Sequence, residues 1–241
     1  MTITVDLPVP QRALAVGAHP DDIEFGCGAT LAKWADAGAR ITLCICTDGA
    51  KGTWEPDADL AALVARREDE QRDAAAVLGA VGVEFLRFVD GELHDTIAAR
   101  AAACAVIRRT KPDIVLGHDP WQRYRLHPDH HEAGMITIGG IVAARDPHFF
   151  PELGLPTHRP LTLLCFEPER VRHIEDVRDH VDRKVDALLA HRSQWRSTMG
   201  IDGDIDADRD SFRRGLHDEA RAAALHAGLR AAEVFSRIDD L

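Results

Sequence analysis

Residues 13–22 read ALAVGAHPDD, a short apolar run that leads directly into a histidine, a proline and two aspartates. Such a run has the length and composition of a β-strand covered on both faces, and the proline favours a turn where the strand ends. A second segment of this kind lies downstream, where the apolar residues 114–117 are followed by HPDH at residues 127–130. Open α/β sheets bind ligands outside the carboxyl ends of their strands, so both polar turns are expected at that edge.

Short apolar runs alternate with longer helical stretches through the rest of the chain, which predicts a mainly parallel sheet with helices on both faces. The expected fold is therefore α/β, a Rossmann-like three-layer αβα sandwich with a C-terminal helical extension. If the strand order reverses after the first strand, the two polar turns lie side by side. The expected strands are residues 13–17, 41–46, 84–88, 114–117 and 161–166, and the expected helices are 28–37, 59–78, 97–109, 129–144, 177–191 and a long run of about 212–238.

Length and composition favour one domain over residues 1–241, with a core at 1–170 and a mostly helical part at 171–241. The net charge of −11 and the absence of a basic stripe argue against a nucleic-acid partner. Residues 146–160 are expected to form a loop, and the alternating aspartates of residues 202–210 a solvated acidic loop. Phe149, Phe150 and the long C-terminal helix could supply the interface of a homo-oligomer.

Cysteine usage and hydropathy indicate the compartment. The five cysteines form no Cys-x-x-Cys pair, which favours buried, reduced thiols. The chain begins without the basic start and apolar core of a signal peptide, and no apolar run approaches the ~20 residues of a membrane span. We therefore expect a cytoplasmic protein without a membrane span.

The two polar turns contain the groups of a catalytic metal site. His19, Asp22 and His130 would form a His₂Asp set for one zinc ion, with a position left for water. Zinc lowers the pKa of a bound water from ~15.7 to ~7. Asp21 is placed by adjacency to act as the general base, and His127 is free to protonate a leaving group or to stabilise an oxyanion.

Neighbouring residues have less certain roles. Asp129 could orient His127 through its ring N–H, or cap the helix that follows. His131 should not reach the metal, because adjacent helical residues point about 100° apart. His118 and His191 are the other histidines most suited to a role in the site. A Gly-x-Gly at residues 26–28 lacks a third glycine, so a dinucleotide site is not expected.

These motifs resemble those of the PIG-L (LmbE-like) zinc-dependent de-N-acetylases. By position, the resemblance implies His19, Asp22 and His130 as zinc ligands, Asp21 as the general base, and His127 as the cationic partner of the tetrahedral intermediate. The implied reaction removes the N-acetyl group from a small N-acetylglucosaminyl compound and releases acetate and a free amine. The similar segments are AHPDDIEFGCGATL at residues 18–31, TDG at 47–49, RREDEQRDAAAVLG at 66–79, DGEL at 90–93, HPDH at 127–130 and HRSQ at 191–194.

The chain departs from the family pattern around the expected pocket. Many members have a glutamate directly after the two aspartates, whereas here Ile23 comes before Glu24. Some members have a mobile tyrosine two residues before the second motif, where this chain has Arg125. The residues expected to contact substrate are Arg67, Asp90, Tyr124 and Arg125.

Alternatives remain open at this point. Arg67 could instead pair with Glu70 on one helix face. The protein could be an amidase acting on a thiol-cofactor conjugate, or a non-catalytic Rossmann-like module that binds a sugar or nucleotide. A binding module would not explain two His/Asp turns at strand ends, and a His₂Asp set does not decide between zinc and another divalent metal such as iron.

Overall fold

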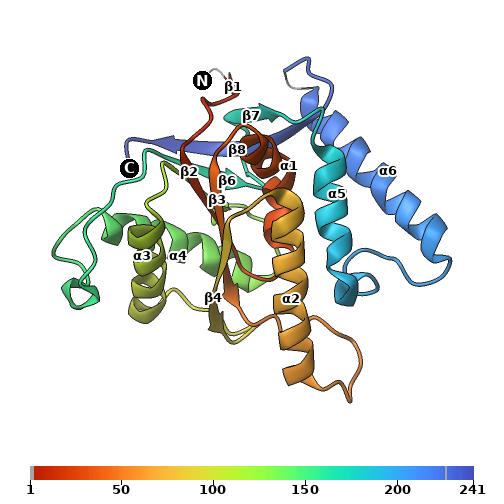
Figure 1. Ribbon diagram of the computed structural model, residues 1–241, viewed down its shortest axis with the longest axis horizontal. Coiled ribbons are helices and arrows are strands. Elements are labelled where there is room, and N and C mark those ends of the chain that lie inside the picture. The colour runs from red at the N-terminus through yellow and green to blue at the C-terminus, as the bar shows by residue number, and fades with distance from the viewer. Residues whose placement is uncertain (1–2, 226) are drawn as a thin grey trace.

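Eight strands form one sheet in the computed structural model, which describes residues 3–225 and 227–241 (Figure 1). Their order is β1-β7-β8-β6-β5-β2-β3-β4, and the pairings from β4 to β6 are all parallel. All five expected strands are confirmed, as β2 to β6. The strands are β1 Thr4–Val5, β2 Arg12–Gly17, β3 Arg40–Thr47, β4 Gly82–Phe88, β5 Ile114–His118, β6 Thr162–Phe166, β7 His173–Asp176 and β8 Ala232–Asp239.

The strand order reverses at β2, which is the condition under which the two polar turns lie side by side. The chain passes from β2 outward through β3 and β4, then returns with β5 on the other side of β2. In this pairing Ala13 lies opposite Ile114, and Ala15 lies opposite Leu116. The carboxyl ends of β2 and β5 therefore adjoin, and the loops that follow them can share one site.

Helices cover both faces of the sheet (Figure 1). The helices α1, α2 and α5 pack against one another on one face, and α3 packs against α4 on the other. Alternate residues of β2 enter the two cores, with Ala13 and Ala15 on one side and Leu14 and Val16 on the other. The helices are α1 Asp22–Asp36, α2 Leu60–Leu78, α3 Ile97–Thr110, α4 Pro128–Ala144, α5 Val181–Ala190 and α6 Ile205–Ala224, with short 3₁₀ turns at Pro151–Leu153 and Arg192–Gln194.

Helix α1 contains a break at Cys27, where φ is −153° and ψ is 17°. Glu233 of β8 accepts the backbone N–H of Ala29 beyond the break, at 3.2 Å. Lys184 of α5 donates to the carbonyl of Phe25 before the break, at 2.6 Å, and to Glu233 at 2.8 Å. An ion pair thus satisfies backbone groups on both sides of the break. The sequence predicted only the part of this helix that follows the break.

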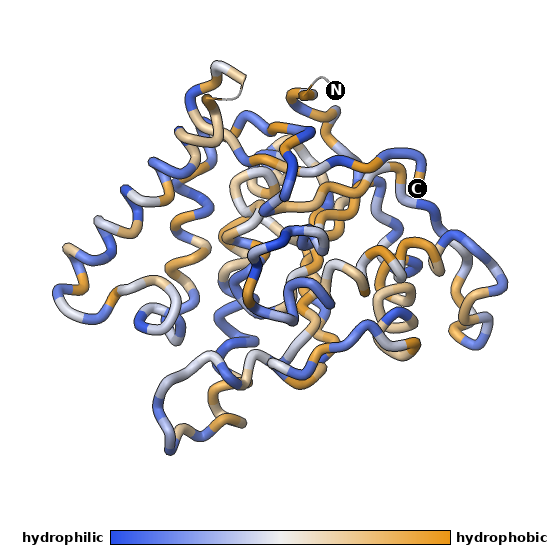
Figure 2. The backbone as a smooth tube through the Cα atoms, turned by 180° about the vertical axis from the view of Figure 1, so that it is seen from behind, coloured by the Kyte–Doolittle hydropathy of each residue, from blue (hydrophilic) through white to orange (hydrophobic). Residues whose placement is uncertain are grey.

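The C-terminal part differs from the expectation of one long helix over residues 212–238. That prediction is wrong in its second half, because α6 ends at Ala224 and β8 forms an antiparallel strand between β6 and β7. Pairing on both sides stabilises β8 despite the helix-favouring composition before it. The expected acidic loop at 202–210 is confirmed only for residues 202–204 and wrong beyond them, because Asp204 caps α6 by accepting the N–H of Ala207. Figure 2 shows α6 as mainly hydrophilic and the central strands as mainly hydrophobic.

The remaining expectations concern caps, thiols and membrane spans. Asp129 is not the N-cap of α4, since His127 takes that position. All five cysteines are buried and free, and burial raises the pKa of the Cys44 thiol to about 12, so it is unreactive. None of the helices in the described part of the chain is both long and apolar enough to cross a membrane.

Candidate active site and metal centre

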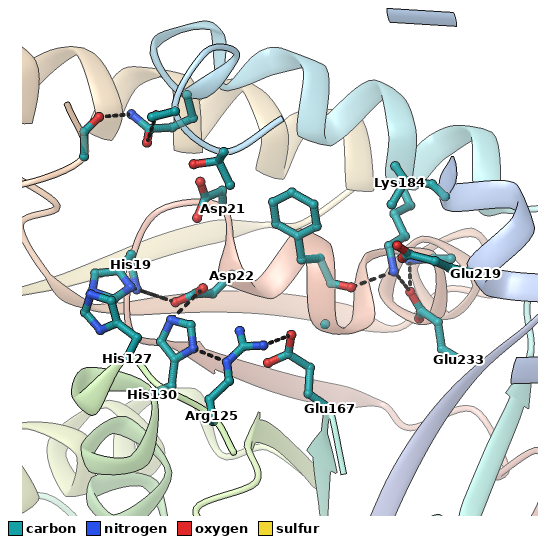
Figure 3. Close-up of a pocket in the computed structure, with 18 of the residues that line it drawn as sticks. His19, Asp21, Asp22, Arg125, His127, His130, Glu167, Lys184, Glu219 and Glu233 are labelled. Atoms are coloured by element: carbon teal, nitrogen blue, oxygen red, sulfur yellow. Dashed lines mark hydrogen bonds and ion pairs between the residues drawn. The ribbon is translucent and has the colours of Figure 1, made fainter. Parts of the chain in front are cut away.

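The turn after β2 projects the first motif into a cavity at the switch point. The N–H of His19 donates to Asp22 Oδ2 at 2.7 Å and closes the turn. Asp21, between them, has φ 106° and ψ −27°, in the left-handed region that residues other than glycine rarely adopt. Asp22 then begins α1, so the two aspartate side chains leave the turn in different directions (Figure 3).

Asp22 is the centre of a cluster of histidines. Its Oδ2 atom lies 3.2 Å from His19 Nδ1, and its Oδ1 atom lies 3.2 Å from His130 Nε2 (Figure 3). His118, at the end of β5, brings Nε2 to 3.3 Å from Asp22 Oδ2. The fold therefore brings together the three predicted metal ligands, and adds a third imidazole, that of His118 from β5. The His127 ring also belongs to this cluster, with its centroid 4.5 Å from that of His19.

Carboxylates surround the other side of His19. Its Nε2 atom lies 3.2 Å from Asp129 Oδ2 and 3.2 Å from Asp90 Oδ1. Burial lowers the pKa of His19, but hydrogen bonds to Asp129, Asp22 and Asp90 outweigh it and raise the pKa to about 12. Asp129 Oδ2 is hydrogen-bonded to His19 Nε2 and also accepts the N–H of Gly91. The histidine partner of Asp129 is therefore His19 and not His127.

This cluster suits a divalent cation. Three overlapping groups of donors each have their atoms within 4.8 Å of one another: His19, His127 and His130; Asp22, His118 and His130; and His19, Asp90 and Asp129. Asp129 Oδ1 is buried and has no hydrogen-bond partner among the described residues. A buried carboxylate oxygen without a partner is costly unless a cation or water satisfies it. Imidazole and carboxylate together are ligands that zinc accepts.

Asp21 lies beside the cluster and has a different environment from Asp22. Burial raises the pKa of Asp21 to about 6, while the guanidinium of Arg67, 3.6 Å from Asp21 Oδ2, opposes the rise. In contrast, the pKa of Asp22 lies well below its usual range, because His130 and His118 outweigh the effect of its burial. Two adjacent carboxyl groups with pKa values moved apart suit different roles in acid–base chemistry.

Arg67 is 3% exposed and lines the cavity. It donates to the carbonyl of Pro20 at 2.6 Å and to the carbonyl of Gly49 at 2.8 Å, so it connects the loops that follow β2 and β3. The alternative that Arg67 pairs with Glu70 is not what the structure shows, since Glu70 accepts hydrogen bonds from the backbone and hydroxyl of Ser193.

Arg125 contacts the second motif directly. Its Nε atom donates to His130 Nδ1 at 2.7 Å, and its Nη1 atom lies 2.7 Å from Glu167 Oε1 (Figure 3). Tyr124 is 87% exposed and does not line the cavity. His131 points away, with Nδ1 2.7 Å from the carbonyl oxygen of Pro120, as the helical spacing predicted.

The cavity has a volume of about 700 Å³, within the range of small-molecule sites. All of the predicted site residues line it except Asp129, which lies against His19, and Tyr124. Burial and the neighbouring rings of His19 and His130 lower the pKa of His127, so in the metal-free state this imidazole favours its neutral form. Trp54, on the loop before α2, is 71% exposed and forms part of the wall.

Two contributors to the site were missed from the sequence. Glu167 follows directly after β6, so the same rule about strand ends that identified the two motifs could have identified it. Gln71 lies one helical turn after Arg67 and accepts the N–H of Asp21 at 3.1 Å. Its spacing of four residues from Arg67 was the available signal.

A mainly parallel sheet that carries a buried His/Asp cluster at its switch point is typical of an α/β enzyme, and this cluster could hold a metal ion. Comparison with known proteins narrows this class. The chain belongs to the PIG-L family, since the model of that family, described as GlcNAc-PI de-N-acetylase, matches residues 14–139. It is thus a hydrolase of the N-deacetylase type.

Individual relatives agree with this assignment. A diacetylchitobiose deacetylase of Thermococcus kodakarensis is 32% identical over 188 residues, which cover 77% of this chain and 70% of the relative. A 1D-myo-inositol 2-acetamido-2-deoxy-alpha-D-glucopyranoside deacetylase of Streptomyces avermitilis is 35% identical over 63% of this chain and 59% of its own length. The solved structure of N,N'-diacetylchitobiose deacetylase from Pyrococcus horikoshii is similar with a TM-score of 0.85 and 27% identity, over 95% of this chain and 84% of that one.

Proposed function

We propose that the protein is a zinc-dependent hydrolase that removes the N-acetyl group from a small N-acetylglucosaminyl compound, releasing acetate and a free amine. The observation that carries the proposal is the cluster of His19, Asp22 and His130 beside a separate buried carboxylate, Asp21, in one cavity. Such a set provides both metal ligands and a base for attack by water on an amide.

In this proposal, His19, Asp22 and His130 hold one zinc ion per chain. Zinc would supply Lewis acidity to the acetamide carbonyl and make a water molecule acidic enough to attack near neutral pH. Asp129 and Asp90, both 3.2 Å from His19 Nε2, hold the ring of that ligand in place.

The chain's own groups move the proton. Asp21 takes the proton of the attacking water, and a proton passes back to the amide nitrogen as the C–N bond breaks, so the amine leaves neutral. Its raised pKa, about 6, leaves Asp21 ionised yet sufficiently basic at neutral pH. The His127 ring lies against His19 at the open side of the cluster, where it can donate a hydrogen bond to the oxygen that gains charge.

The substrate class rests on the relatives together with the cavity. Relatives that act on diacetylchitobiose and on an inositol glycoside differ in the group attached to the sugar, but both names describe a 2-acetamido-2-deoxyglucosyl unit. We assign Arg67, Asp90 and Arg125, which line the cavity, to contacts with this unit. Tyr124 stays a candidate only if its loop moves toward the bound sugar, because its side chain is exposed to solvent.

The test measures release of free amine from N-acetylglucosamine, N,N'-diacetylchitobiose, 2-acetamido-2-deoxyglucosyl inositol and an amide of a thiol conjugate. The protein is assayed as purified, after chelation, and after zinc, iron(II) or magnesium is added back. We expect turnover of at least one of the three sugar substrates, loss of turnover on chelation, and recovery with zinc. Binding of these sugars without amine release under any metal condition would refute the proposal and favour a binding module. Cleavage restricted to thiol-conjugate amides would favour the amidase alternative.

A further inference from the structure

The backbone of the proposed base is held in an unusual conformation by two side chains of α2. Asp21 has a φ of 106°, and its N–H donates to Gln71 Oε1 of α2 at 3.1 Å. The preceding carbonyl, that of Pro20, accepts from Arg67 of the same helix at 2.6 Å. Arg67 and Gln71 are four residues apart and lie on one face of α2. Together they hydrogen-bond the carbonyl and the N–H of the peptide that joins Pro20 to Asp21.

The side-chain amide of Gln71 cannot flip by 180° without losing its hydrogen bonds. Its Nε2 atom donates to Glu24 Oε1 at 2.6 Å, while its oxygen accepts from Asp21. Gln71 and Glu24 are both 0% exposed, so water does not replace either contact. A carboxylate on one side and an N–H on the other therefore select a single orientation of the amide.

Glu24 is itself unusual, because it is a fully buried carboxylate in the first turns of α1. Its second oxygen, Oε2, has no hydrogen-bond partner among the described residues, but it forms an ion pair with His191 Nε2 at 3.7 Å. A buried carboxylate is costly unless it is paired and hydrogen-bonded. In the described part of the chain, its hydrogen bond comes from Gln71.

We propose that Gln71 is a positioning residue for the reaction and that Glu24 acts through it, so that the two hold the Asp21 peptide in its left-handed conformation and aim its carboxylate at the substrate. This inference rests on the proposed function, in which Asp21 is the base. Neither residue is expected to touch substrate, because neither lines the cavity.

The chain offers a swap that tests this arrangement. Gln71→Glu places two carboxylates in contact and removes the donor to Glu24. Glu24→Gln combined with Gln71→Glu restores a donor and an acceptor in reversed order, while residue 71 still accepts from Asp21. Glu70→Gln is the matched control, because Glu70 lies next to Gln71 on α2 but contacts Ser193 instead.

Two measurements separate this inference from the proposed function. The first is hydrogen exchange of the Asp21 amide in the full-length protein by NMR, which needs no activity. We expect faster exchange in Gln71→Glu, recovery in the swapped double variant, and no change in Glu70→Gln. Unchanged Asp21 exchange in Gln71→Glu, or no recovery in the double variant, would overturn the inference even if the wild type deacetylates no sugar.

The second measurement is the steady-state kinetics of the zinc-loaded variants. A misplacement of about 1 Å can lower a rate about 100-fold, so we expect a kcat loss of that order in Gln71→Glu with KM and bound zinc unchanged, and recovery in the double variant. A loss of zinc, or a rise in KM with kcat retained, would contradict a positioning role. An inactive wild type would refute the proposed function and leave the exchange result to decide this inference.

Discussion

Replacing Glu233 with glutamine should destabilise the protein strongly, although the residue lies outside the metal cluster. Glu233 accepts the N–H groups of Ala29 and Thr30 at 3.2 and 2.8 Å and pairs with Lys184 at 2.8 Å. Glutamine has nearly the same volume, but it removes the charge that compensates a largely buried ammonium and turns one acceptor into a donor. Breaking a buried pair by removing one partner costs about 3–5 kcal/mol.

The free energy of unfolding can be measured by urea titration, and the midpoint by thermal melting. In a chain of 241 residues each 1 kcal/mol shifts Tm by about 2–4 °C, so a loss of 3 kcal/mol lowers Tm by roughly 6–12 °C. Glu219→Gln is the matched control, because Glu219 is an exposed carboxylate on the wall of the same cavity. A loss below about 1 kcal/mol in Glu233→Gln, as for a surface pair, would refute the reasoning.

Three further predictions concern the metal site. Asp21→Asn should retain zinc but lose about 10²–10⁴-fold in kcat, since a general base contributes that much; near-wild-type turnover would remove Asp21 from this role. His130→Ala should lower the zinc content well below one per chain, measured by elemental analysis, and stoichiometric zinc would count against His130 as a ligand. The metal-free protein holds a proton on His19, whose pKa is raised to about 12, and zinc must displace it. The Kd for zinc should therefore fall about tenfold per pH unit between pH 6 and 8, measured by competition with a chelator; a pH-independent Kd would contradict this assignment.

The sequence was sufficient for the part of the fold in which local pattern and tertiary structure agree. The runs behind residues 19 and 127 are apolar throughout because both faces of β2 and β5 are covered, and that pattern is visible without coordinates. From the sequence, the reversal of strand order was only the condition under which the two polar turns meet, and the structure has that reversal. The grouping of His19, Asp22 and His130 could therefore be predicted from the sequence, whereas their role as metal ligands stays a prediction.

Other features depend on contacts between distant segments. Strand β8 follows a helical, Arg- and Ala-rich stretch, and only its pairing with β6 and β7 stabilises it as a strand. The break in α1 depends on Lys184 and Glu233, which lie far along the chain. The partner of Asp129 was mistaken for a similar reason: sequence adjacency suggested His127, whereas the pairing of β2 with β5 presents His19.

The place of β8 in the sheet also has a consequence for the order of folding. In the strand order, β7 and β1 join the other strands through β8, which is the last strand in the chain. During synthesis, β7 must wait for residues 232–239 before it can pair with β8, and until then β6 keeps an unpaired edge. A nascent chain lacking this strand would expose that edge beside the cluster of His19, Asp22 and His130, all of which precede it in the chain. Assembly of this cluster and completion of the sheet should therefore be separable events in time, and α1 gains its contacts with Glu233 only at the second.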